Sequence, residues 1–185
     1  FMYALLGILA FAIAVFVERT ITLFRCRVDA AGVLARIKLG LDTGAAPTLG
    51  STPLESVLAA GLAEPDPELG WDAMQAAAVD AEQRIRRRIP YLAAVASIAT
   101  MVGLFGTVYG LIQAFGALGD VAAAERAARL SEGSSTAMAS TAFGLFVAIP
   151  ALAAHSALDG QARSLLAAIE ATAGRVHVLR RSRAR

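Results

Sequence analysis

The sequence contains one cysteine and two histidines among 185 residues. Cys26 therefore cannot form a disulfide within the chain, and a single thiol with scattered histidines gives no metal-ligand spacing. His155 and His177 stand apart from other nucleophiles and bases, so no cluster typical of a hydrolytic or redox active site is present. We therefore predict that the protein is not an enzyme and that it holds neither a metal nor a cofactor.

Charged residues are scarce as well, at 17% of the chain, and three runs contain none: residues 1–17, 89–119 and 133–158. About 20 apolar residues cross the hydrocarbon core as a helix, so the second and third runs are long enough and the first is at the short limit. Because the chain begins at Phe1 and not at a methionine, we expect part of the first span to precede it. A signal peptide is the alternative for this run, but it has neither a basic start nor a small-residue cleavage site.

Basic residues gather on one side of the three predicted spans. Fifteen of the 17 Lys and Arg residues lie in residues 18–88 and 159–185, and the cluster RIRRR comes directly before the second span. The positive-inside tendency places both segments in the cytoplasm and residues 120–132 outside. We predict transmembrane helices at 1–17, 89–119 and 133–158, a cytoplasmic helical segment at 18–88, an outer loop at 120–132 and a cytoplasmic C-terminal helix at 159–185. No strand-like alternation occurs, so the fold class is an all-α membrane protein.

The cytoplasmic segment contains recognisable helix boundaries. Thr52, Pro53 and Glu55 form a capping-box pattern that predicts the start of a helix. The alanine-rich sequence from Trp71 onward contains no helix breaker before Pro90. It is therefore predicted to enter the second span as one long helix, bent at Pro90.

Small residues recur at three- and four-residue spacing inside the second and third spans, on one face of each helix: Gly103, Gly106, Gly110 and Gly144. Such faces let helix backbones approach closely in lipid. Thr107 and Thr141 lie on the same faces at comparable depth. Each hydroxyl can return to the preceding turn of its own helix, or it can line a narrow polar path. The second possibility requires several copies around an axis, because one such chain cannot enclose a pore.

Two sequence strings then resemble a known family: RIRRRIPYLAAVASIATMVGLFGTVYGLIQAF and STAMASTAFGLFVAIPALAAHSAL. They are similar to the second and third spans of the MotA/TolQ/ExbB proton-channel family, and VERTITLFR resembles the exit of its first span. The resemblance implies a homo-pentamer in the bacterial inner membrane, with a periplasmic N-terminus and a cytoplasmic C-terminus. It also implies a cavity that holds a dimeric single-span partner of ExbD, TolR or MotB type, whose intramembrane aspartate carries H⁺ or, in some members, Na⁺.

By the same resemblance, Thr107 and Thr141 match the two threonines that face the pore. The family glutamate that lies five residues before the second threonine is replaced here by Thr136, and the nearest acid is Glu132, one helical turn further out. Either Glu132 stands in for that glutamate, or the path relies on hydroxyls and the partner's aspartate. A family proline is replaced by Thr100, which predicts a straighter second span.

The function implied is that of a pentameric stator subunit in an ion-driven motor, coupling ion flow to mechanical work in TonB-type, Tol-type or gliding machinery. A flagellar role is disfavoured by the short cytoplasmic segment. The alternative is a membrane scaffold of the same fold that does not conduct, and the missing glutamate is its main support. A channel without a partner is weakest, since the spans hold no charge of their own to relay an ion.

Overall fold

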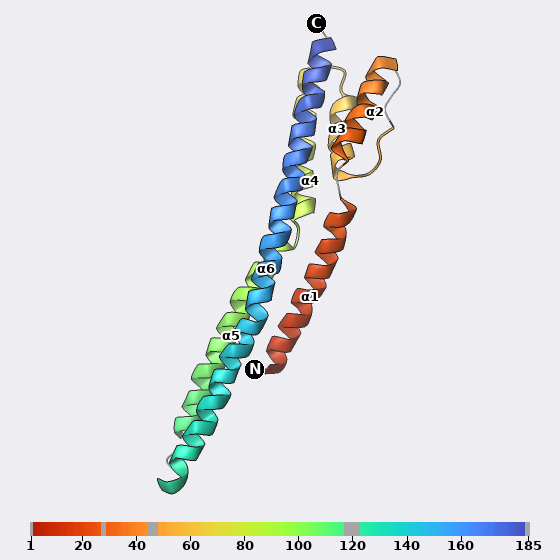
Figure 1. Ribbon diagram of the computed structural model, residues 1–185. Coiled ribbons are helices and arrows are strands. Elements are labelled where there is room, and N and C mark those ends of the chain that lie inside the picture. The colour runs from red at the N-terminus through yellow and green to blue at the C-terminus, as the bar shows by residue number, and fades with distance from the viewer. Residues whose placement is uncertain (1, 27–28, 44–47, 117–122, 184–185) are drawn as a thin grey trace. The chain divides into compact units, whose positions relative to one another are not determined.

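The computed structural model describes residues 2–26, 29–43, 48–116 and 123–183, which form helices and no strands (Figure 1). The helices are α1 (Met2–Arg25), α2 (Ala30–Thr43), α3 (Pro53–Ala63), α4 (Pro67–Arg86), α5 (Ile89–Gly116) and α6 (Ala123–Arg183). Three helical regions are long and apolar enough to cross a membrane: Met2–Gly40, Pro67–Gly116 and Glu125–Arg183. For the described part of the chain, this confirms the prediction of an all-α protein with three long apolar helices.

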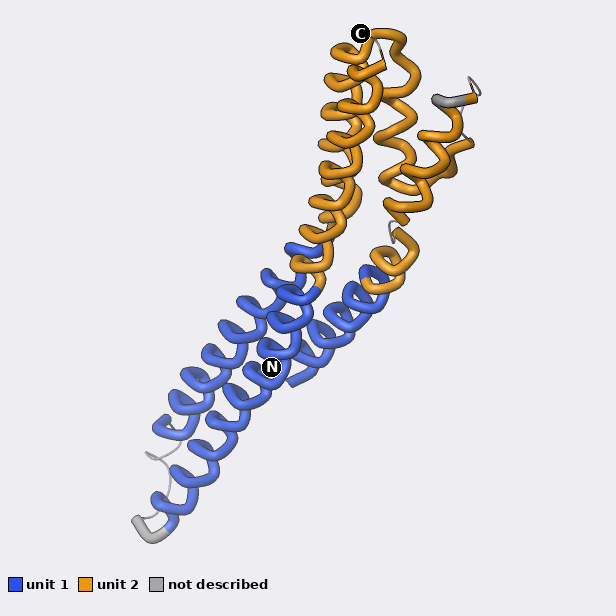
Figure 2. Tube along the Cα trace, turned by 45° about the horizontal axis from the view of Figure 1, so that its top comes forward, with its two compact units in different colours: residues 1–19, 88–157 blue, residues 20–87, 158–185 orange. Residues whose placement is uncertain are grey.

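The chain divides into two compact units (Figure 2). Unit 1 comprises residues 1–19 and 88–157, which include most of α1, all of α5 and the first part of α6. Unit 2 comprises residues 20–87 and 158–185, which include α2, α3, α4 and the last part of α6. The apolar runs fall in unit 1 and most of the charged residues in unit 2.

In unit 1, α5 and the first part of α6 lie side by side and antiparallel (Figure 1). Gly103 faces Gly144, Gly110 faces Ala137, and Ala114 faces Gly133, so residue numbers fall along α6 as they rise along α5. The small side chains of these positions allow the two backbones to approach closely in the absence of a hydrophobic drive between helices in lipid.

The predicted continuous helix through Pro90 is wrong. Helix α4 ends at Arg86 and α5 begins at Ile89, so Pro90 occupies the first turn of α5. A proline ring conflicts with the carbonyl four residues earlier, here that of Arg86, but it fits a first helical turn. The chain instead turns at Arg88, which has a left-handed φ of 67°, and the Arg88 guanidinium donates to both carboxylate oxygens of Glu18 at 2.5 and 2.6 Å.

The predicted outer loop at 120–132 also differs from the structure. Helix α6 already begins at Ala123 and continues without a break to Arg183, while residues 120–122 lie outside the described residues. The prediction placed the helix boundary where the charge-free run begins. Charge alone does not end a helix, and the Ala, Glu, Arg and Leu residues of this stretch are good helix formers.

In unit 2, α3 and α4 form a helical hairpin. Thr52 and Glu55 make the predicted capping box at the start of α3, which is thereby confirmed. Asp66 caps α4 by accepting a hydrogen bond from the Glu68 amide at 2.8 Å, so α4 begins at Pro67 and not at Trp71. Asp and Asn are favoured at this position because their side chains satisfy amides that have no partner in the helix.

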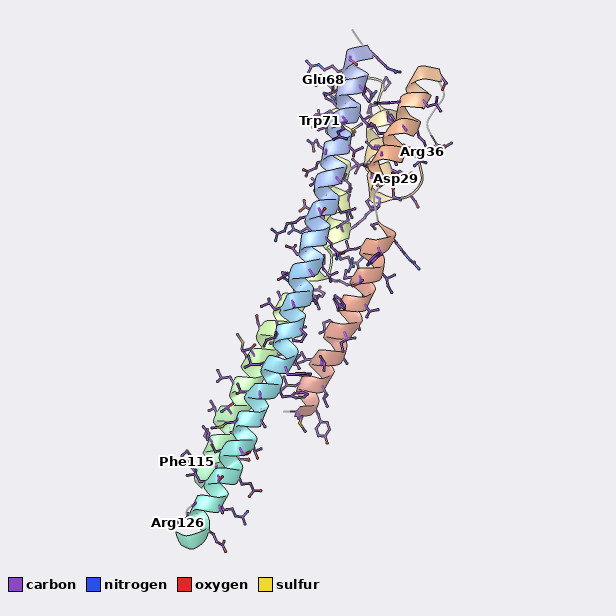
Figure 3. The ribbon with its side chains drawn as sticks, in the orientation of Figure 1. Asp29, Arg36, Glu68, Trp71, Phe115 and Arg126 are labelled. Carbon is purple, nitrogen blue, oxygen red and sulfur yellow. The ribbon has the colours of Figure 1, made fainter. Side chains whose placement is uncertain are left out.

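The last part of α6 packs along α4 in unit 2. The ring centroids of Trp71, which is labelled in Figure 3, and His177 lie 5.1 Å apart. The Arg86 guanidinium donates to the Asp159 carboxylate at 3.0 Å. Arg180 donates to the carbonyls of Gly61 at 2.6 Å and Pro65 at 3.2 Å, and also to that of Glu64. The guanidinium therefore satisfies carbonyls at the end of α3, which the helix itself leaves without donors.

Candidate functional site

The closest approach of α5 and α6 occurs at a pair of glycines. A Cβ atom added to Gly144 would lie 2.8 Å from the Ala99 carbonyl oxygen and 2.9 Å from the Gly103 Cα. A Cβ atom added to Gly103 would lie 3.0 Å from the Gly144 Cα. The backbones meet without intervening side chains here, and any larger residue would displace them. About two turns further along α5, Gly110 faces Ala137 of α6. Gly106, between Gly103 and Gly110, is buried.

Thr107 and Thr141 meet beside this glycine contact, one turn from Gly103 and Gly144 respectively. Their hydroxyl oxygens contact each other across the two helices. The Thr107 hydroxyl also lies 3.3 Å from the carbonyls of Gly103 and Ala137, and the Thr141 hydroxyl lies 3.2 Å from the Gly103 carbonyl. Both side chains are half-buried. The structure thus brings together the two threonines that the sequence analysis singled out.

The two hydroxyls have more acceptors than protons. Each hydroxyl has one proton to donate and two lone pairs, so Thr107 can donate to Gly103, to Ala137 or to Thr141, but to only one of them at a time. A small rotation about the side-chain bond exchanges these partners. The pair can consequently accept a hydrogen bond from an incoming donor or offer one to an incoming acceptor, without a charged group in the span.

Thr136 and Glu132 do not join this pair within one chain. Five residues separate Thr136 from Thr141, which is a rotation of about 140° around the helix. Both Thr136 and Glu132 are exposed, and the Thr136 hydroxyl returns to the Glu132 carbonyl at 3.0 Å. The Thr100 hydroxyl likewise returns to the Ala96 carbonyl of its own helix at 2.9 Å.

The sequence analysis overlooked a polar pair on the exposed face of α5. The Gln113 amide donates to the Tyr109 hydroxyl at 3.0 Å, and Tyr109 is 44% exposed. Gln113 is the one amide side chain in the charge-free run at 89–119, so its presence was a visible signal. An exposed polar pair in an apolar span is typical of a helix face that meets protein or water instead of lipid.

Comparison with known proteins identifies the family from the helices that carry this site. The family model described as the MotA/TolQ/ExbB proton channel family matches residues 50–171, more than half of the chain. The chain belongs to the MotA/TolQ/ExbB proton channel family. The matched range contains α3, α4, α5 and most of α6, and therefore both threonines and the glycine contact. Helix α1 lies outside it.

Relatives within the family include proteins of two kinds. The chain is 37% identical over 94 residues to the Tol-Pal system protein TolQ of Pseudomonas aeruginosa, covering 51% of this chain and 40% of that protein. It is 42% identical over 77 residues to TolQ of Haemophilus influenzae, covering 42% and 33%. It is 37% identical over 102 residues to the biopolymer transport protein ExbB of Neisseria gonorrhoeae, covering 51% and 44%.

The matched regions thus span less than half the length of these relatives. Family membership and the geometry of the α5–α6 contact are properties of this MotA/TolQ/ExbB chain itself. Its partners, its ion and the machine that it serves are matters for proposal.

Proposed function

We propose that this chain is a stator subunit of an ion-driven motor in the bacterial inner membrane, with its N-terminus in the periplasm and its C-terminus in the cytoplasm. Five copies form a ring around the single-span helices of an ExbD- or TolR-type dimer. Ion flow, of protons first and of sodium as the second candidate, drives mechanical work in a Tol-type, TonB-type or gliding machine. The TolQ and ExbB relatives support this assignment.

The single observation that carries the proposal is the Thr107–Thr141 hydroxyl contact between the charge-free segments of α5 and α6. A threonine that serves only its own helix bonds the preceding turn, as Thr100 does. Thr107 and Thr141 also reach across to the neighbouring helix, and they keep lone pairs for a third group. A protonated carboxyl from a partner helix is such a group, and a hydroxyl can hold it without the cost of a second buried charge.

In this function Thr107 and Thr141 form the inner part of the ion path of each copy. Thr136 and Glu132, on another side of α6, line the outer part, where neighbouring copies meet around the axis. The glycines Gly103, Gly106, Gly110 and Gly144 hold the helices close enough for the hydroxyls to meet.

The test is proton uptake by vesicles that contain the full-length protein together with an ExbD- or TolR-type single-span subunit. Thr107→Val and Thr141→Val, which keep the side-chain shape, are expected to abolish uptake while the oligomer stays intact on native gels. Thr100→Val is the matched control, because it removes a hydroxyl that contacts only its own helix. Uptake at the wild-type rate by both Thr107→Val and Thr141→Val would contradict the proposed path.

A scaffold that does not conduct is the second candidate. It is favoured by the exposed Thr136 hydroxyl, which stands where relatives keep a glutamate and which bonds its own helix. In that case the wild-type complex assembles with its partner, but vesicles that contain it take up no more protons than empty vesicles. Uptake of Na⁺ by the same vesicles distinguishes a sodium-driven motor from a scaffold.

A further inference from the structure

One face of α4 presents apolar and acidic side chains that unit 2 leaves uncovered. Leu69 is 57% exposed and Val79 is 56% exposed, and Asp72 and Ala76 between them are exposed as well. The spacings of three, four and three residues place all four on one side of the helix. Leu69 and Val79 offer apolar area on this side of α4 that another protein can cover. We call these four residues the α4 stripe.

A groove between α2 and α6 has the complementary character. It holds about 560 Å³ and is lined by apolar and basic residues: Leu34, Lys38, Ala171, Gly174, Arg175, Val178 and Leu179. Val178 is 65% exposed, and Lys38 and Arg175 are exposed too. No residue of α4 lines the groove, so it and the α4 stripe are separate surfaces of unit 2.

Among the side chains that the structure describes, in residues 2–26, 29–40, 43, 48–116 and 125–183, the ion pairs involve other residues than Asp72, Lys38 and Arg175. Their neighbours behave differently: Glu68 pairs with Arg181, for example, at 3.6 Å. The carboxylate of the α4 stripe and the two cations of the groove are therefore available to each other between two copies.

The two surfaces also lie at the same level along the helices. The Trp71–His177 ring contact and the Glu68–Arg181 ion pair fix the antiparallel register of α4 and α6 in unit 2. By this register Leu69 lies level with Leu179 and Arg180, and Asp72 with Val176 and His177, so Val178 and Arg175 lie within about one turn of those levels. In a closed ring whose axis runs parallel to these helices, successive copies are not shifted along the axis. Two surfaces that meet between neighbouring copies must therefore lie at the same height along that axis.

We propose that the α4 stripe of one copy docks into the α2–α6 groove of the next copy. Leu69 packs against Val178 and Leu179, and the Asp72 carboxylate lies between the Lys38 ammonium and the Arg175 guanidinium. The contact is heterologous, so each copy uses one stripe and one groove, and closing the ring covers every one of them. The inference rests on the proposed ring and goes further, because it names the cytoplasmic surfaces that join its copies.

Cross-linking in membranes tests the contact directly. In full-length protein with Cys26→Ser, the double substitution Asp72→Cys and Arg175→Cys is treated with a short bis-maleimide. The expected product is a ladder of cross-linked species that ends at the size of the closed ring. Each single substitution is expected to give no ladder. Asp72→Cys with Ser164→Cys is the matched control, because Ser164 lies on the same face of α6 but 11 residues, or about 16 Å, away.

Charge reversal gives an independent measurement. Asp72→Arg removes two attractive pairs and places three cations together, so it is expected to weaken assembly by more than about fivefold, the effect of one exposed charge pair. Adding Lys38→Asp and Arg175→Asp to Asp72→Arg restores opposite charges, and the assembly should recover. Native mass spectrometry measures the oligomer in each case.

The possible results separate the two proposals. If the ring keeps its mass, three results overturn the docking surface and leave the ring standing. They are the absence of a ladder with Asp72→Cys and Arg175→Cys, a ladder in the Ser164→Cys control, and no recovery after the full charge reversal. Cross-linking of Arg175→Cys to the single-span subunit, with none to Asp72→Cys, assigns the groove to that subunit and also overturns the proposal. A monomer by native mass spectrometry overturns the ring and the docking surface together.

Discussion

Gly144→Ala is the substitution that most directly tests how α5 and α6 hold the threonine pair. The added Cβ would lie 2.8 Å from the Ala99 carbonyl oxygen and 2.9 Å from the Gly103 Cα. Both are backbone atoms, so they cannot rotate away as the end of a side chain could. Ordinary contact at a Cβ begins at 3.4 Å, so the two helices must separate by 0.6 Å at this level.

That separation is large enough to break the hydrogen bonds from the two threonines to carbonyl oxygens of the facing helix. Thr107 to the Ala137 carbonyl would lengthen from 3.3 to 3.9 Å, and Thr141 to the Gly103 carbonyl from 3.2 to 3.8 Å. Both distances are then too long for a hydrogen bond, and each lost bond lowers the free energy of unfolding by about 1 kcal/mol. Alanine gains about 1 kcal/mol over glycine inside a helix. With an overpacking cost of about 1–3 kcal/mol, the net destabilisation is about 2–4 kcal/mol.

Gly160→Ala is the matched control in the same helix, because no atom lies within 4 Å of its added Cβ. It is expected to raise the free energy of unfolding by about 0.5–1 kcal/mol. Thermal unfolding of the purified full-length protein, followed by circular dichroism, measures both variants, and vesicle uptake reports whether the threonine pair still works. If Gly144→Ala proves as stable as Gly160→Ala, the close approach of α5 and α6 is refuted.

Two further substitutions test unit 2. Hydrogen bonds from Thr52 and then from Arg36 lower the pKa of Glu55 from 4.5 to about 2. The ionised carboxylate therefore stabilises the fold above pH 4.5, and this contribution is lost as the pH falls towards 2. Glu55→Gln should remove this pH dependence, about 2 kcal/mol after allowance for solvent screening, and an unchanged acid-unfolding curve would contradict it. Arg180→Met leaves the carbonyls at the end of α3 without their donor and should lower the free energy of unfolding, measured by thermal unfolding, by about 2 kcal/mol. The control Arg181→Met removes one exposed ion pair at 3.6 Å and should cost less than about 1 kcal/mol. Equal losses would show that Arg180 does not cap α3.

The helices that were predicted best are those whose signals are local. The capping box at Thr52 and the apolar length of α5 depend on residues close in sequence, and both appear in the structure. The errors concern boundaries where two local signals compete. At Pro90 the sequence analysis predicted a bend within one helix, but the conflict of the proline ring with the Arg86 carbonyl ends α4 outright. Before Gly133, helix propensity prevailed over the change from charged to apolar residues.

The sequence analysis named candidate residues for the ion path without showing which of them meet. Thr107 and Thr141 were assigned from their small-residue faces and comparable depth, and Thr136 and Glu132 from the resemblance to the family. In the structure only Thr107 and Thr141 meet, because the 140° rotation between Thr136 and Thr141 is a property of the helix that linear depth does not reveal. The Gln113–Tyr109 pair was overlooked because its meaning depends on which face of α5 stays exposed.

The sequence by itself determined the all-α class, the three long apolar helices and the resemblance to the MotA/TolQ/ExbB family, since hydropathy and short motifs need no knowledge of contacts. The tertiary structure alone decided which small residues touch. Gly103 and Gly144 are 41 residues apart in sequence, and their contact depends on the antiparallel register of two helices. The tertiary structure alone also decided that Asp72 and Arg175 lie at a similar height along α4 and α6. Side-chain contacts of Trp71 and Glu68 with α6 fix that register, and no periodicity within either helix encodes it.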